Sequence, residues 1–152
     1  MDRIALMLEE RERLLEKKEQ NLSRISELDE MILECKKQLG HYSTIVFLND
    51  CDLDMYRRKS FVLEKGLEFS FANLVSTVHN RIKMFMLECE NRSFDSSRTY
   101  YQNEIKSYKE EKRYLENENI VLNNSVFVID YELKKDFVDP NNVDDKSLFL
   151  RR

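Results

Sequence analysis

Three cysteines and two histidines are the side chains of this sequence best suited to hold a metal ion or to attack a substrate. No two of them follow the Cys-x-x-Cys or His-x-x-x-His spacing that places two ligands on one metal. The odd number of cysteines and their wide spacing also argue against a disulfide framework and favour a reducing compartment. We therefore expect no metal and no cofactor, with buried, unreactive thiols at Cys35, Cys51 and Cys89. His41 and His79 are expected to be packed or solvated polar residues.

Carboxylates are abundant, but their pattern is typical of a solvated helix surface. The chain has 29 acidic and 25 basic residues, which are interleaved along its length and leave a net charge of −4. Mixed charge of this kind carries no catalytic signal, and the two glycines are too few for a phosphate-binding loop. No half of the chain is basic, as a nucleic-acid-binding surface would require. The sequence predicts a protein that is not an enzyme and does not bind nucleic acid.

Targeting signals are also missing from the sequence. It has no stretch of about 18 apolar residues, so no membrane span is predicted. Residues 1–10 become acidic after a short apolar patch and lack the apolar region and cleavage site of a signal peptide. Together with the cysteine usage, this pattern predicts a cytoplasmic protein.

The scarcity of glycine and proline indicates the fold class. The chain has two glycines and one proline in 152 residues, whereas a β-rich fold needs many turn residues. Charged residues make up 36% of the chain, against about 25% in an average globular domain. We predict an all-α fold, namely an elongated antiparallel coiled-coil helical hairpin over residues 1–137 with a long second helix.

The first helix is predicted at about residues 4–48. Its apolar residues repeat every seven positions, as in a coiled-coil seam that drifts along the helix. Asn49-Asp50-Cys51-Asp52 favours a turn and a cap for the next helix, although Gly40 offers an earlier end and residues 43–48 also suit a short extended piece. The three rows of the seam are Leu8, Leu15 and Leu22; Ile25, Ile32, Leu39 and Val46; and Leu28, Cys35 and Tyr42.

The second helix is predicted at about residues 53–137, before Pro140, and residues 138–152 are expected to form a flexible tail. Its first half carries large apolar residues at helical spacing, including Leu74, Val78, Ile82 and Phe85. From residue 98 the heptads become regular and include two polar seam positions. These rows are Tyr101, Tyr108, Leu115, Leu122 and Ile129; and Ile105, Lys112, Asn119, Val126 and Leu133.

Two alternatives remain for this second segment. Residues 92–97 are polar enough to break the helix, and a break there would give a three-helix bundle instead of a hairpin. Residues 125–129 taken alone resemble a strand, but they stay in phase with the preceding heptads and are therefore expected to be helical.

The predicted lengths of the two helices indicate a binding surface. At about 1.5 Å per residue, the first helix spans roughly 65 Å and the second roughly 125 Å. The first helix would then leave the seam of residues 98–137 without a partner inside the chain, and an exposed apolar seam is a site of association. Candidate partner-binding residues on it are Tyr101, Tyr108, Leu115 and Leu122.

A basic cluster follows the predicted turn. Tyr56, Arg57, Arg58 and Lys59 are either a solvated helix face or a set of contacts to an acidic partner at the tip of the hairpin.

The layout of the chain resembles the FliJ-like central-stalk family of type III secretion and flagellar export, with the nearest likeness to invasion-type stalk proteins. The likeness covers roughly residues 15–137 and is carried by Leu53-Asp54-Met55-Tyr56-Arg57-Arg58-Lys59-Ser60-Phe61-Val62-Leu63-Glu64-Lys65. Lys112-Arg113-Tyr114-Leu115 and the run from Phe127 to Leu133 are similar to a lesser degree, and the tail after Pro140 departs from the pattern.

This resemblance implies a non-enzymatic stalk that bridges the hexameric export ATPase and the export gate. It also implies a long antiparallel hairpin, with Tyr56, Arg57, Arg58 and Lys59 as candidate contacts. Two other functions fit the residues themselves. One is a helical-hairpin chaperone or targeting partner that pairs with a secreted protein, and the other is a self-associating coiled-coil scaffold.

Overall fold

The computed structural model describes residues 3–65 and 71–137, and every one of these residues is helical. Helix α1 spans Arg3–Lys65 and helix α2 spans Phe71–Phe137. The described residues contain no strand, which confirms the predicted all-α fold. Gly66 and the predicted tail at 138–152 lie outside the described residues.

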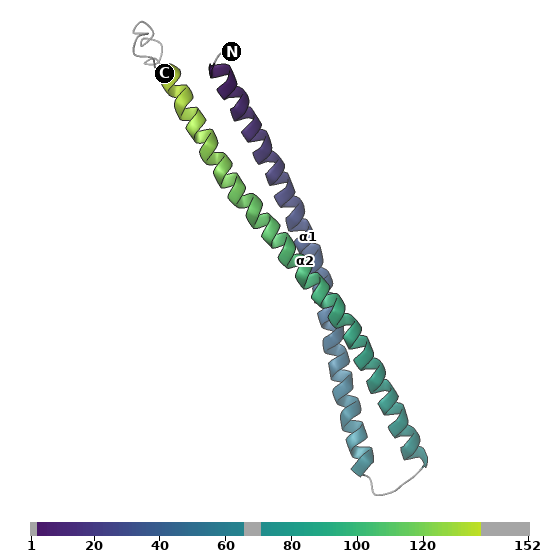
Figure 1. The fold of residues 1–152 in the computed structure, drawn as a ribbon. Coiled ribbons are helices and arrows are strands. Elements are labelled where there is room, and N and C mark those ends of the chain that lie inside the picture. The colour runs from purple at the N-terminus through teal and green to yellow at the C-terminus, as the bar shows by residue number, and fades with distance from the viewer. Residues whose placement is uncertain (1–2, 66–70, 138–152) are drawn as a thin grey trace, which may run out of the picture. The chain divides into compact units, whose positions relative to one another are not determined.

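The two helices pair within two compact units of the chain. Unit 1 contains the described residues 3–29 and 110–137, and unit 2 contains 30–65 and 71–109. In each unit a segment of α1 lies beside a segment of α2 (Figure 1). Partner numbers fall along α2 as they rise along α1: Arg11 meets Asp130 whereas Arg24 meets Glu111 in unit 1. The predicted antiparallel packing of two long helices is therefore confirmed.

The predicted position of the hairpin turn is wrong. Helix α1 does not end near residue 48 but continues through Asn49-Asp50-Cys51-Asp52 to Lys65, and α2 begins at Phe71 rather than near residue 53. The Asn49 side chain is buried and donates a hydrogen bond to Asn91 Oδ1 at 2.9 Å. An asparagine that finds its partner across the seam does not need a turn, so the local preference of this residue was overridden by packing.

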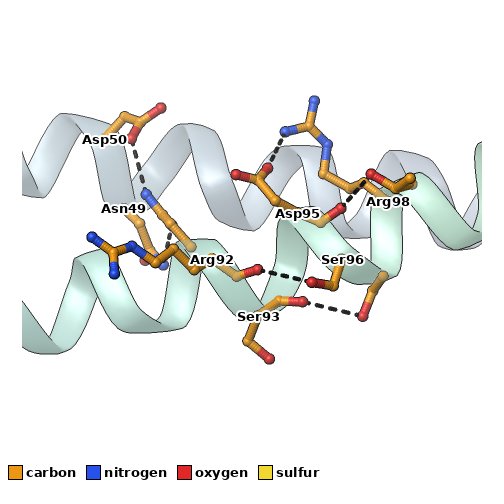
Figure 2. A network of polar contacts seen from close by, with 10 residues as sticks. Asn49, Asp50, Arg92, Ser93, Asp95, Ser96 and Arg98 are labelled. Carbon is orange, nitrogen blue, oxygen red and sulfur yellow. Dashed lines mark hydrogen bonds and ion pairs between the residues drawn. The ribbon is translucent and has the colours of Figure 1, made fainter.

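The second predicted weak point is also helical, so the three-helix bundle does not form. Residues 92–97 lie inside α2, and the hydroxyls of Ser96 and Ser97 donate to the carbonyls of Arg92 and Ser93, four residues earlier. Figure 2 shows these bonds, with Arg98 Nη1 bonded to Asp95 Oδ1 at 3.0 Å beside them. Side chains that favour loops are thus satisfied within the helix.

The seam between the helices matches most of the predicted heptad rows. Both rows on α2 are buried or half-buried from residue 101 to residue 133, and residues 125–129 are helical as predicted. On α1 the rows through Ile32 and Leu28 face α2, and Leu28 is fully buried. The first predicted row is wrong at Leu8 and Leu22, which are exposed, whereas Leu15 is half-buried. The seam passes instead through Met7, Leu14 and Asn21.

Candidate protein-interaction surfaces

The far seam, which the sequence predicts to be a free binding surface, is covered by α1. Leu122 is buried and Leu115 is half-buried against α1 in unit 1. In unit 2 the ring of Tyr101 stacks on Tyr42 of α1, with 5.9 Å between ring centroids. The two helices have 63 and 67 residues, so α1 is long enough to cover α2. The prediction of an unpaired seam at 98–137 is therefore wrong.

Tyr108 is held in this seam by its own helix. Its hydroxyl donates to Glu104 Oε2 at 2.6 Å. This hydrogen bond to the carboxylate, followed by burial, raises the pKa of Tyr108 to about 12. The phenol is thus a fixed donor inside unit 2 rather than a group available to a partner.

Asn119, one of the two predicted polar seam positions, forms a buried amide pair. Asn21 Nδ2 donates to Asn119 Oδ1 at 3.0 Å and to Glu118 Oε2 at 2.9 Å, and both asparagines are buried. Lys17 Nζ lies 2.6 Å from Glu118 Oε1. The hydrogen bonds from Lys17 and Asn21 lower the pKa of Glu118. A buried polar pair of this kind fixes the register of a coiled coil at some cost in stability.

Lys112, the other polar seam position, is satisfied at the edge of the seam. Its Nζ lies 2.6 Å from Asp29 Oδ1, and the hydrogen bond to Asp29 raises the pKa of Lys112. Lys112 therefore extends its stem along the seam and places its charge at the surface.

Unit 2 has its own polar seam. Besides the Asn49–Asn91 bond, Asn91 Nδ2 donates to Asp50 Oδ1 at 3.0 Å, and both bonds are drawn in Figure 2. Elsewhere in this unit, Asn80 and Ser60 are buried, and Ser60 Oγ has no hydrogen-bond partner among the described residues. Polar side chains thus occupy a large part of the α2 face that meets α1 in unit 2.

The basic cluster lies on α1 well inside the helix, not beside a turn at residue 52. Arg57 contacts Asp54 at 3.4 Å and Glu88 of α2 at 3.7 Å, so it helps to hold the two helices together. Lys59 Nζ lies 5.6 Å from the centre of the half-buried Tyr56 ring, a cation–π distance. Arg58 is exposed and forms no ion pair with a residue that the structure describes. Of the four predicted contacts, Arg58 is the most available to a partner.

A second exposed surface, which was not predicted to be a binding site, lies at the start of α2. We call it the outward stripe, and its residues are 46–79% exposed. They recur every three or four positions and so lie on one side of α2. The sequence shows this spacing, but spacing alone does not say whether an apolar side of a helix is covered. The outward stripe consists of Phe71, Leu74, Val75, Val78, Ile82, Phe85 and Met86.

The thiols differ from the prediction at two positions. Cys35 is half-buried, and burial raises the pKa of its thiol. Cys51 and Cys89 are exposed, although buried thiols were expected. Within the described residues, no group of three or more histidine, cysteine, aspartate or glutamate side chains is arranged to hold a metal ion. The same part of the chain has no helix that is long and apolar enough to cross a membrane.

Comparison with known proteins adds no relative: no family model, curated protein or solved structure matches this chain.

Proposed function

We propose that this chain is a non-enzymatic, cytoplasmic stalk component of a type III protein secretion apparatus. In this role it bridges a hexameric export ATPase and an export-gate protein and hydrolyses nothing itself. The observation that carries the proposal is the pairing of two helices of 63 and 67 residues, because a long antiparallel helix pair is the fold that the family resemblance implies.

The charge pattern along the helix pair supports this role. Ion pairs tie α1 to α2 in both units, for example Arg24 with Glu111 at 2.9 Å and Arg57 with Glu88 at 3.7 Å. Exposed ion pairs contribute little individually, typically about 0–1 kcal/mol. A surface that carries many such weak, interchangeable charges suits a helix pair that contacts several identical subunits of a ring in turn.

The paired far seam weakens the chaperone or targeting hypothesis. An open apolar seam at 98–137 would have suited four-helix packing with a client, and α1 already occupies it. The stalk hypothesis requires no open seam.

The test is the effect of the purified chain on a purified hexameric type III export ATPase. We expect the chain to bind the ATPase and to increase its rate of phosphate release. Arg58→Glu should weaken both effects, because it reverses an exposed charge that has no ion pair within the described residues. Arg113→Glu is the matched control, since Arg113 is exposed on α2 and also forms no ion pair with a described residue. No binding and no change in rate with the wild-type chain would contradict the proposal.

A further inference from the structure

The outward stripe lies on the side of α2 that faces away from α1. The residues of α2 that meet α1 in the same stretch are Asn73, Thr77, Asn80, Met84, Leu87 and Asn91, all buried or half-buried. At about 100° per residue, these positions lie roughly opposite the stripe on the helix circumference. This stretch of α2 therefore turns its more polar side toward α1 and its apolar side toward solvent.

The stripe is large for an uncovered surface. Its seven side chains expose about half or more of their area, which amounts to roughly 700 Å² if each side chain of this size offers about 150–200 Å². The largest apolar patch of a typical monomer is about 300–600 Å². A standard protein interface buries about 800 Å² on each partner. Two copies of the stripe thus supply nearly the area that a stable dimer needs.

We propose that a second copy of this chain covers the outward stripe, with the two α2 helices packed in parallel and in register. The dimer then has the order α1–α2–α2′–α1′ in its unit 2 segments, in which each α2 uses one side for its own α1 and the opposite side for its partner. This interface differs from the far seam of residues 98–137. It is also independent of the proposed stalk function, because it is a property of the purified chain alone.

The spacing of the stripe supports a two-stranded coiled coil. Phe71, Val78 and Phe85 are seven residues apart, and Val75, Ile82 and Cys89 form the second row of the same heptads. The second row places Val75 and Ile82 at successive a positions. β-branched residues at a positions favour two-stranded coiled coils.

The charges beside the stripe favour the parallel arrangement. Arg81 lies next to the centre of the stripe on α2. Full overlap of two antiparallel stripes brings the two copies of Arg81 together, and like charges across a coiled-coil interface are unfavourable. In the parallel arrangement Arg81 faces the partner copy's Met86, because flanking positions five residues apart then meet.

The first test is the mass of the full chain by sedimentation equilibrium over a range of concentrations. We expect the mass to rise from 18.4 kDa toward twice that value as concentration increases. Ile82→Glu should abolish the rise, because it places a charge in the centre of the stripe. A chain that stays monomeric up to high micromolar concentration would overturn the proposal.

Leu48→Glu is the matched control for this substitution. Leu48 of α1 is 56% exposed and Ile82 is 54% exposed, but Leu48 lies outside the stripe. Circular dichroism should show unchanged helicity for both variants, since both positions face solvent. A dimer that persists in Ile82→Glu, or one that Leu48→Glu abolishes equally, would show that another surface is responsible and would overturn the proposal.

The second test uses the exposed Cys89 as a reporter of orientation. In a parallel in-register pair the two copies of Cys89 oppose each other at an a position, near the Cα separation of about 4.4–6.8 Å that a disulfide requires. Mild oxidation with diamide, followed by peptide mapping, should give a Cys89–Cys89′ disulfide, and Cys51, exposed on α1, should give none. A dimer in which Cys89 does not crosslink would overturn the parallel arrangement.

Discussion

The buried pair of Asn21 and Asn119 tests how the seam of unit 1 is held together. Asn21→Leu removes the donor to Asn119 Oδ1 and leaves that buried oxygen without a partner, which costs about 1–3 kcal/mol of unfolding free energy. Asn119→Leu is expected to cost less, about 0.5–1.5 kcal/mol, since it removes one hydrogen bond and Asn21 keeps its second acceptor, Glu118. The two substitutions therefore differ in effect although each replaces one member of the same pair.

The double variant, with leucine at positions 21 and 119, distinguishes the net value of the hydrogen bond from the cost of leaving a buried polar atom unpaired. With leucine at both positions no buried polar atom is left unpaired, so we expect stability within about 1 kcal/mol of the wild type, or above it. The losses of the single variants are thus not additive, as expected for residues in contact. Urea unfolding followed by circular dichroism at one low protein concentration measures all four proteins. Equal losses in the two single variants, or a double variant whose loss equals their sum, would refute this account of the seam.

Three further predictions concern other parts of the helix pair. Leu28→Ala should lower the free energy of unfolding by about 2–5 kcal/mol, because Leu28 is fully buried. Leu33→Ala, at a position 55% exposed, should change this free energy by less than about 0.5 kcal/mol. Similar losses for the two variants in urea titrations would contradict the described seam. The pKa of Tyr108 is raised in the folded chain to about 12, so the neutral phenol stabilises the fold fully below the ordinary tyrosine pKa of about 10, and this stabilisation is lost as pH rises toward 12. Tyr108→Phe should therefore lose less stability than the wild type between about pH 10 and 12. The same pH dependence of stability in both proteins would show that Tyr108 does not contribute. Thr99→Ala should raise the midpoint of thermal unfolding, because alanine is favoured over threonine in an exposed helix by roughly 0.5 kcal/mol. The hydrogen bond that is lost, from the Thr99 hydroxyl to the Asp95 carbonyl, lies within the same helix. A lower midpoint would show that this hydrogen bond matters more than helix propensity.

Heptad spacing predicted the seam where apolar and polar residues alternate regularly. The rows through Leu28 and Ile32 on α1 and through Leu122 and Asn119 on α2 are all in the seam. Spacing succeeds there because two rows, three or four positions apart, run side by side through these segments, whereas exposed apolar residues such as Ile120 and Phe127 belong to neither row. It failed at Leu8 and Leu22, which share a seven-residue repeat but lie beside the seam.

The position of the turn was not predictable from local preferences. Asn49 and Asp50 are typical turn residues, yet both use their side chains for the hydrogen bonds to Asn91 that join α1 to α2. The sequence around a polar residue in a seam can be the same as the sequence around a polar residue in a turn. Only the partner residue 42 positions along the chain distinguishes them, and that contact depends on the fold as a whole.

This error in the turn also produced the error in the predicted binding surface. A turn at residue 52 made the second helix far longer than the first and left Leu115 and Leu122 uncovered. With α1 extended to Lys65, these residues become part of the intramolecular seam. Exposed apolar residues occur along both helices, for example Phe47 on α1 and Phe127 on α2, but a run of them at helical spacing lies at the start of α2.

The reversed polarity of residues 71–91 decides what stabilises this part of the chain. Toward α1, Asn80 and Asn91 contribute polar groups to the seam, and a hydrogen bond adds only about 0.5–1.5 kcal/mol net. On the other side, covering even half of the roughly 700 Å² of the outward stripe is worth on the order of 9 kcal/mol before the costs of association. Association of two copies can therefore add substantially to the stability of this stretch on the side away from α1. In the proposed dimer Ile82 and Phe85 belong to the interface, and the seam on the opposite side supplies register through its asparagines as well as apolar contacts through Leu53 and Leu87.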